Sequence, residues 1–233
     1  MSLTSRSAAG KWTTHAEATV VTEADGGGGG TARGRRRAGA EYFDARERAA
    51  RSGMASVDPG ELYARVAATG LAYGPSYACL RELWIGAGEA IGRVRLREAE
   101  EERRADFSVA HPALLDACLH ALGGLVASEA ARAGAGAVAG EREGGEEGAE
   151  NKQRHSRGAY LPVGAEEIRV LEPLRGTGDV WCHVALEGHF DGDGSGSGSA
   201  AVSAGRTIRS WVRVYAGDER GRSRLCVEIS GFT

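Results

Sequence analysis

The sequence has few of the features that assign a chain to a chemical class at once. Its 233 residues include only 5 prolines, and 29 basic residues nearly balance 32 acidic ones, for a formal net charge of −3. Such a balance gives no indication of nucleic acid or an anionic membrane as a partner. No uninterrupted apolar run approaches the length of a membrane span, and the first residues, MSLTSRSAAGKWTTH, lack the apolar centre of a secretory signal. We therefore expect a cytoplasmic protein with no membrane span and no nucleic acid partner.

Cysteine is also scarce, and the 4 cysteines lie far apart among apolar neighbours. They are Cys79, Cys118, Cys182 and Cys226. This spacing indicates buried thiols in a reducing compartment, and it does not fit a disulfide framework or a zinc site. The histidines show no ligand-like spacing either, so we predict no metal site.

Several catalytic signatures are missing from the sequence. It contains no nucleophile elbow and no Cys-x-x-Cys pair. The glycine run at 26–30 lacks the lysine and the framing strand and helix that a phosphate-binding loop requires. These absences exclude the commonest hydrolase, nucleotide-binding and dithiol chemistries as first hypotheses.

Glycine, in contrast, is abundant, and most of it lies in three low-complexity tracts. They span residues 23–41, 131–158 and 191–205. Each tract is too polar or too rich in glycine to offset the entropy of ordering it, so we expect linkers or loop insertions. The basic cluster at 35–37 is then a solvated part of the first linker, although a localisation signal or an anion contact is an alternative.

Between these tracts the hydrophobic periodicity predicts one buried helix and several strands. A charged segment at 42–53 tolerates a helix, and 57–70 has Asp58 as N-cap, Pro59 in the first turn, Glu61 three residues after the cap and Gly70 as a stop. Residues 111–126 are apolar almost all round and predict a buried helix. Strands are expected at 11–21 (without a partner before it), 80–96 with a central turn, 167–173, 180–186, 207–215 and 224–230. This pattern indicates an α+β domain in which an antiparallel sheet wraps a central helix.

The buried helix contains two ionisable residues four positions apart, in the stretch HPALLDACLH at 111–120. Asp116 and His120 project from the same side of the helix, so their side chains can touch. An unpaired carboxylate in apolar surroundings has a raised pKa, which suits a general acid. The alternative is that Asp116 reaches solvent or a local salt bridge. His111, at the start of the helix, fits a capping or packing role.

HPALLDACLH also resembles the second active-site motif of the dehydratase domains of modular polyketide synthases and animal-type fatty acid synthases. That motif begins with histidine and proline, continues to a catalytic aspartate and has glutamine or histidine four residues later. Three further stretches resemble the family in the same order: GLAYGPSY at 70–77, AYLPVGAEEIRV at 159–170, and KWTTHAEATVV at 11–21. Four matching motifs in the family's order make the resemblance specific.

The resemblance implies a hot-dog fold, a long helix wrapped by an antiparallel sheet, as the second half of a double hot dog. Residues 1–22 would then be a remnant of the last strand of the first half, 23–56 a linker with a short helix, and 57–233 the second half with insertions at 131–158 and 191–205. The implied partners are an acyl carrier protein, the first half and other synthase domains. The implied reaction is loss of water from a β-hydroxyacyl thioester that the phosphopantetheine arm of the carrier protein delivers, with no cofactor bound directly.

The resemblance also assigns roles to individual residues. Asp116 would protonate or hydrogen-bond the departing β-hydroxyl, and His120 would orient Asp116. The substrate tunnel would be lined in part by Tyr73, Gly74, Pro75, Leu161 and Pro162.

One departure from the family separates two classes of function. The family's base is a histidine in a histidine-x-x-x-glycine-x-x-x-x-proline motif of the first half, and these 233 residues contain no such motif. We therefore expect a dehydratase fragment, a truncated gene product or a degenerate copy that is inactive alone, because elimination needs an acid and a base. The alternatives are a noncatalytic hot-dog module that scaffolds a synthase or binds acyl chains, and a product-template cyclase.

Overall fold

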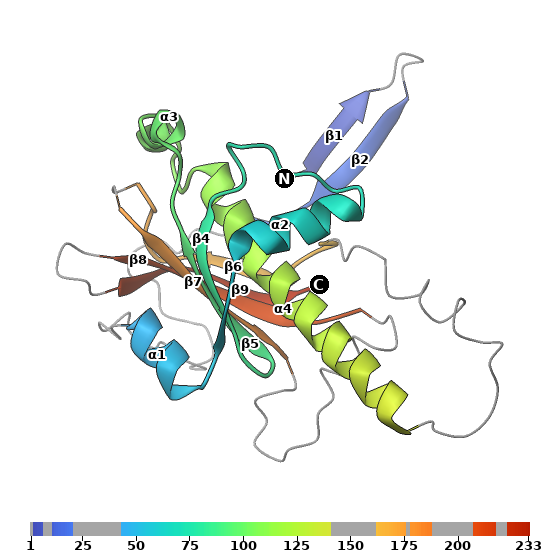
Figure 1. Cartoon of the computed structure of the whole chain (residues 1–233). Helices are drawn as coiled ribbons and strands as arrows, with labels where there is room; N and C mark the ends of the chain where they lie inside the picture. The colour runs from blue at the N-terminus through green and yellow to red at the C-terminus, as the bar shows by residue number, and fades with distance from the viewer. Residues whose placement is uncertain are drawn as a thin grey trace, which may run out of the picture. The chain divides into compact units, whose positions relative to one another are not determined.

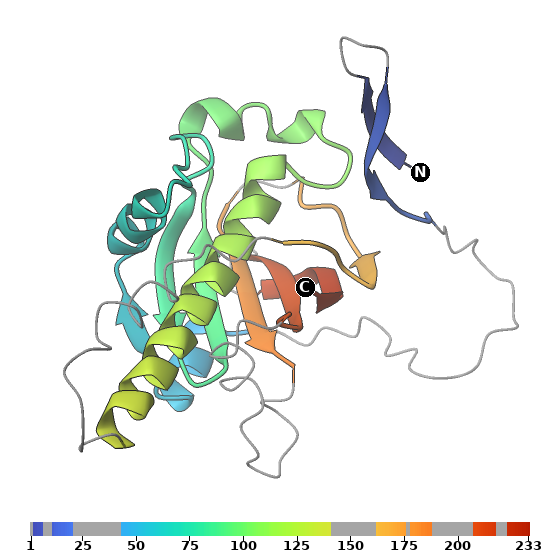
Figure 2. The same cartoon turned by 90° about the vertical axis from the view of Figure 1, so that its right-hand side faces the viewer.

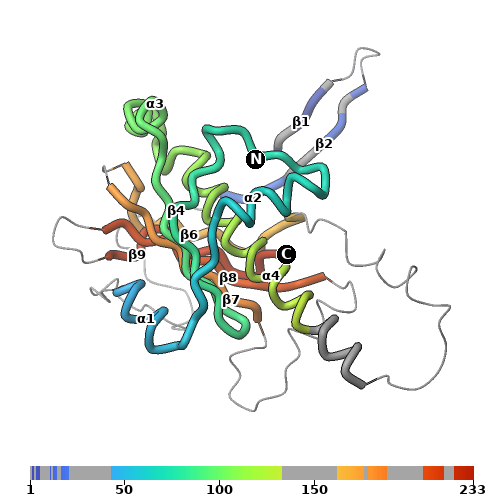
Figure 3. The backbone as a smooth tube through the Cα atoms, viewed as in Figure 1, coloured from blue at the N-terminus to red at the C-terminus, as the bar shows by residue number. Residues whose placement is uncertain are grey.

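The structure is a computed structural model that describes residues 2–6, 11–20, 43–140, 162–175, 178–187, 207–217 and 223–233. In Figure 3 these residues are drawn in colour, apart from the last part of the long helix and parts of the two strands near the N-terminus. The chain divides into two compact units, Met1–Arg37 and Ala38–Thr233.

The first unit contains a β-hairpin. Strand β1 (Ser2–Arg6) pairs antiparallel with β2 (Trp12–Glu17), and the register shifts between Leu3 and Thr4. The prediction of a strand at 11–21 without a preceding partner is therefore wrong. The partner strand has the sequence SLTSR, which is polar and does not alternate, so its pairing left no hydrophobic pattern to detect.

The second unit is built on a seven-stranded sheet whose neighbouring strands are all antiparallel. In spatial order the strands are β3 (Ala55–Val57), β4 (Leu80–Ile85), β5 (Glu89–Val94), β7 (Val180–Leu186), β8 (Ser210–Gly217), β9 (Ser223–Phe232) and β6 (Glu167–Val170). The helices are α1 (Ala45–Arg51), α2 (Pro59–Ala68), α3 (Glu98–Glu101) and α4 (Pro112–Gly140), with a 3₁₀ turn at Arg104–Asp106. Figures 1 and 2 show α4 running across one face of the sheet. The predicted antiparallel sheet around a central helix is confirmed.

Helix α2 begins where its sequence predicts, and α1 lies within the segment 42–53 that tolerates a helix. The carboxylate of Asp58 accepts a hydrogen bond from the Gly60 backbone N–H at 3.0 Å, Pro59 occupies the first turn of α2, and Gly70 has a positive φ of 95° just after the helix. Asp44 caps α1 in the same way, through the backbone N–H of Glu47 at 2.8 Å.

Several boundaries differ from the predictions. Helix α4 continues to Gly140, so the expectation of an insertion from 131 is wrong for residues 131–140. Alanine is frequent in this stretch and extends the helix despite the glycines. Residues 141–158, and 191–205, lie outside the described residues. Strand β8 starts at Ser210, three residues later than predicted, and the short elements β3 and α3 were not predicted.

Helix α4 supplies the centre of the core. It is buried against β4, β5, β7 and β8 by a row of small and apolar side chains. The fully buried members on the helix include Ala113, Leu114, Ala117, Cys118, Ala121 and Leu125. By length and composition Pro112–Arg132 would also suffice to cross a membrane, but 61% of that window is buried inside the structure. Packing against the sheet therefore accounts for its hydropathy.

Two buried thiols meet at this interface. Cys118 on α4 contacts Cys182 on β7, and this contact together with burial raises the pKa of the Cys118 thiol well above its ordinary value. All 4 cysteines are free and buried, which confirms the prediction of buried thiols.

The opposite face of the sheet carries a second, smaller cluster. Ile91 of β5 packs there against Ala45 and Ala49 of α1, with Trp84 and Trp181 beside them. Even and odd positions of the central strands therefore face different helices, as the alternation of a sheet requires.

A buried ion pair fixes α1 on this second face. The Glu89 carboxylate lies 2.8 Å from His183 Nε2 and 3.0 Å from Arg48 Nη2, and Phe43 and Trp211 pack around His183. Burial by itself raises the pKa of Glu89, but the hydrogen bonds from His183 and Arg48 more than offset burial and lower the pKa from 4.5 to about 2. The ionised carboxylate is thus the form that the fold stabilises.

Replacing this carboxylate should destabilise the fold in a pH-dependent way. At pH 7, Glu89→Gln should lower the free energy of unfolding by roughly 3 kcal/mol, because Arg48 and His183 lose their buried counter-charge. A lowered pKa stabilises the fold above the unfolded-state pKa, so the difference from wild type should shrink as the pH falls from 4.5 toward 2. Urea unfolding over this pH range measures it.

Glu228→Gln is the matched control, since Glu228 pairs with Arg213 where both side chains are partly exposed. This substitution should lower the free energy of unfolding by less than about 1 kcal/mol. A Glu89→Gln effect that stays constant over the acidic range would contradict the assignment.

Close approach of α4 to the sheet requires a glycine on β5. A Cβ atom at Gly92 would lie 2.8 Å from Leu80 Cδ1, 2.9 Å from Cys182 Sγ and 3.3 Å from Ala121 Cβ. No real Cβ atom sits this close, so a side chain here would push the helix or its neighbours outward.

Gly92→Ala should therefore lower the free energy of unfolding by about 1–3 kcal/mol through overpacking. Gly123→Ala, on the exposed side of α4 with no atom within 4 Å of its Cβ, should instead raise it by about 0.5–1 kcal/mol because alanine favours the helix. Urea unfolding of the two variants measures both effects. Equal effects of the two variants would show that the α4–sheet contact tolerates a larger side chain.

Candidate active site

The two ionisable residues of α4 form a direct pair. His120 Nε2 lies 3.0 Å from Asp116 Oδ2, as the spacing of four residues predicts. The Asp116 side chain is 38% exposed, whereas that of His120 is 3% exposed. The assumption that Asp116 is an unpaired carboxylate in apolar surroundings is therefore wrong. The alternative prediction, in which Asp116 reaches solvent or a local pair, is the one that the structure has. Asp116 remains accessible to another molecule, and His120 is its buried partner.

Tyr63, from α2, holds the other side of His120. Its hydroxyl lies 3.0 Å from His120 Nδ1 and accepts a hydrogen bond from the Leu80 backbone N–H at 3.1 Å. Burial raises the pKa of Tyr63 to about 12, so its hydroxyl stays protonated at neutral pH. Sequence reasoning missed this residue, because only the docking of α2 beside α4 brings positions 63 and 120 together.

Tyr73 completes the group from the loop after α2. Its ring lies 3.9 Å from the His120 ring and 5.8 Å from the Tyr63 ring, centroid to centroid. Burial raises the pKa of Tyr73, and the nearby charge of Asp116 raises it further. Tyr73 therefore lies next to Asp116 and His120, which agrees with its predicted place in the site.

The remaining predicted site residues divide into three cases. Gly74 and Pro75 follow Tyr73 in an exposed turn, where the Gly74 carbonyl accepts hydrogen bonds from the backbone N–H groups of Tyr77 and Ala78. Pro162 is exposed, and among the described contacts none joins it to Asp116. Leu161 lies outside the described residues.

His111 has the structural role expected of it. Its Nδ1 accepts a hydrogen bond from the Ala113 backbone N–H at 3.2 Å, and its Nε2 lies 3.2 Å from Glu100 Oε2. The ring thus caps the start of α4 and ties it to α3.

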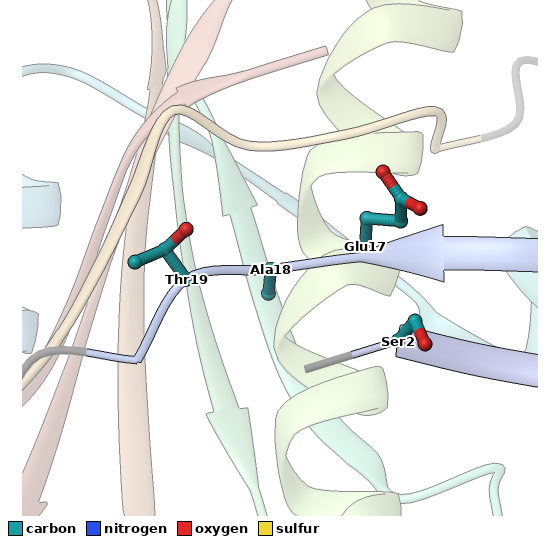
Figure 4. Close-up of a pocket in the computed structure, with 4 residues that line it drawn as sticks. All are labelled: Ser2, Glu17, Ala18 and Thr19. Atoms are coloured by element: carbon teal, nitrogen blue, oxygen red, sulfur yellow. The ribbon is translucent and has the colours of Figure 1, made fainter.

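Two other features of the described residues do not form a site of this kind. The hairpin of the first unit has an open depression lined by Ser2, Glu17, Ala18 and Thr19, shown in Figure 4, and it contains none of the predicted site residues. Among the described residues, no group of three or more histidine, cysteine, aspartate or glutamate side chains could hold a metal ion.

The segment that contains this site is similar to a known family. Residues 43–139, which contain Asp116, His120, Tyr63 and Tyr73, match the family described as "Polyketide synthase dehydratase N-terminal domain". The match covers less than half of the chain, and it shows that this segment is similar to the dehydratases of polyketide synthases. The description names the N-terminal domain, so this match does not assign the dehydratase segment to the second half of a double hot dog.

Relatives among curated proteins are themselves polyketide synthases. Polyketide synthase GfsB of Streptomyces halstedii is 46% identical over 71 residues, which are 30% of this chain and 1% of that protein. Mycoketide-CoA synthase of Mycobacterium tuberculosis is 42% identical over 71 residues, 30% of this chain and 2% of that protein. The aligned segment is thus a small part of each of these much longer proteins.

Solved dehydratase domains confirm the hot-dog fold. The dehydratase domain from the CurK module of curacin polyketide synthase matches with a TM-score of 0.59 at 23% identity, over 100% of this chain and 61% of that one. The dehydratase domain of a mycocerosic acid synthase-like polyketide synthase matches with a TM-score of 0.61 at 16% identity, over 99% of this chain and 62% of that one. The chain therefore spans about three fifths of these dehydratase domains.

Removing the charge of Asp116 should change the titration of Tyr73. Asp116→Asn should lower the pKa of Tyr73, because a nearby negative charge disfavours the tyrosinate, but burial should keep that pKa above its ordinary value of 10.0. NMR titration of tyrosines labelled at Cζ measures the shift. Asp106→Asn, at a 68% exposed side chain, is the control and should leave the Tyr73 titration unchanged. Equal titration of Tyr73 in Asp116→Asn and wild type would contradict the placement of the two residues.

Proposed function

We propose that this chain contributes the acid side of a polyketide synthase dehydratase that eliminates water from a β-hydroxyacyl thioester. The observation that carries the proposal is the Asp116–His120 pair, with its exposed carboxyl and buried imidazole, in the segment that matches the dehydratase family. In the elimination, a base takes the α-proton, the C–O bond breaks, and the hydroxyl leaves as water with a proton from Asp116. His120 touches Asp116 and orients it.

Delivery by an acyl carrier protein is part of this proposal. Its support is that the curated relatives are polyketide synthases, which carry their intermediates on phosphopantetheine. No cofactor bound directly by the chain is needed for the elimination. Tyr73, whose titration responds to Asp116, and the next two residues in the sequence, Gly74 and Pro75, would contact the acyl chain, with Leu161 and Pro162 as further tunnel residues. A cytoplasmic location is also proposed, and the 4 free thiols support it.

The base would come from a first hot-dog half. Support comes from two solved variants of the CurK dehydratase that are described as inactive, one with a histidine replaced by phenylalanine and one with an aspartate replaced by asparagine. A surface for such a partner is offered by β6, an edge strand on which Ile168 and Val170 are 62% and 46% exposed. The competing proposal is a noncatalytic module that binds acyl chains, which the missing histidine motif favours.

A complementation assay tests the proposal. The chain alone should give no measurable turnover of a β-hydroxyacyl carrier-protein substrate, and turnover should appear when a separately expressed first half bearing the histidine motif is added. In that mixture Asp116→Asn should lower turnover by about 10²–10⁴-fold, the usual contribution of a general acid. Asp106→Asn should leave turnover unchanged.

Two outcomes would contradict the proposal in different ways. Turnover by the chain alone that is lost in Asp116→Asn would show that the base is present in these residues. No turnover from halves that are shown to associate would favour the noncatalytic module.

A further inference from the structure

A continuous line of hydrogen bonds ends at the candidate acid. It runs from the Leu80 backbone N–H to the Tyr63 hydroxyl at 3.1 Å, from Tyr63 to His120 Nδ1 at 3.0 Å, and from His120 Nε2 to Asp116 Oδ2 at 3.0 Å. The line crosses three elements, because Leu80 begins β4, Tyr63 is on α2 and His120 is on α4. Each atom in it has a limited capacity to donate or accept, and that capacity fixes where the hydrogens lie.

The first group in the line is the backbone N–H of Leu80, which can only donate a hydrogen bond. The Tyr63 oxygen accepts this hydrogen bond, and its own hydrogen needs an acceptor because the ring is largely buried. Among the described atoms, His120 Nδ1 is the acceptor within reach. If Tyr63 donates to Nδ1, the proton of a neutral His120 must sit on Nε2, and it then points at Asp116. An imidazolium, or the other tautomer, would leave the Tyr63 hydrogen without a partner in this line.

We propose that Tyr63 is a positioning residue that holds His120 in the Nε2–H tautomer and so keeps the acidic proton of Asp116 on Oδ1. This proposal rests on the dehydratase function proposed above. With Nε2–H donating to Oδ2, a protonated Asp116 must carry its hydrogen on Oδ1, which is free of the described contacts and available to substrate. With the opposite tautomer, Asp116 would donate its proton to Nε2, and the imidazole would capture the proton that the departing hydroxyl needs.

The surroundings keep this arrangement rigid. The rings of Tyr63 and Tyr73 enclose His120, at centroid distances of 5.5 and 3.9 Å. Since the His120 side chain is 3% exposed, water cannot replace Tyr63 freely as a donor to Nδ1. Tyr63 is therefore the group that decides between the two tautomers.

The test reads the tautomer directly, and it needs no turnover. The full chain labelled with ¹⁵N-histidine should show His120 near pH 7 with a protonated Nε2 and a bare Nδ1, assigned by loss of that signal in His120→Gln. In Tyr63→Phe the ratio of the Nε2–H to the Nδ1–H tautomer should fall roughly fivefold or more, the effect of losing one hydrogen bond. Tyr77→Phe, at a 45% exposed tyrosine, should leave the ratio unchanged.

The variant His120→Gln should preserve the hydrogen bonds that His120 makes. A glutamine amide can donate from nitrogen to Asp116 and accept at oxygen from Tyr63, the same order of donor and acceptor as the proposed tautomer. In the complementation assay, with the variants shown to be folded by a cooperative melt, His120→Gln should keep most of the turnover. Tyr63→Phe should lower kcat and shift its pH profile.

Three results would overturn the proposal: an Nδ1–H tautomer in wild type, an imidazolium at pH 7, or a ratio that Tyr63→Phe does not change. The proposed function fails separately. If the tautomer behaves as expected but the mixed halves give no turnover, Tyr63 positions His120 in a module that is not a dehydratase.

Discussion

Burial of α4 against the sheet is the constraint on which the rest of the structure depends. The helix is apolar almost all round, so the sheet must curve around it, and contact at backbone distance is possible only where residues are small. Gly92 on β5 and Ala117 and Ala121 on α4 meet this requirement. The position of the helix relative to the strands is therefore set by steric fit, with little freedom to slide.

This steric fit also determines where the candidate catalytic residues lie. Asp116 and His120 lie in the second and third turns of α4, where the opposite side of the helix is buried, and α2 and the loop after it enclose their side. One carboxyl therefore remains at the boundary with solvent while its imidazole partner is inside. A helix in the core gives such a site its rigidity, since moving Asp116 would require moving the whole core.

The parts of the structure that the sequence predicted are those that depend on local spacing. The N-cap at Asp58 and the contact between Asp116 and His120 each involve residues within four positions, and both are present. The prediction failed where the structure depends on contacts between separate segments of the chain. The polar strand β1 was missed because only its partner β2 makes it a strand, and Tyr63 was missed because its role is created by contact with a residue 57 positions away. The premise that Asp116 is an unpaired carboxylate in apolar surroundings failed for the same reason, since exposure depends on which elements cover the helix.

The attachment of α1 differs in kind from that of α4. Helix α1 has seven residues and buries only Ala45 and Ala49, with Arg48 and Glu89 supplying the polar link to the sheet. Its local opening would expose the smaller of the two apolar clusters and so should cost less free energy than global unfolding. Amide hydrogens of α1 should therefore exchange with solvent faster than those of the buried part of α4. The domain thus has a peripheral layer that can move without disturbing Asp116, Tyr63 or His120.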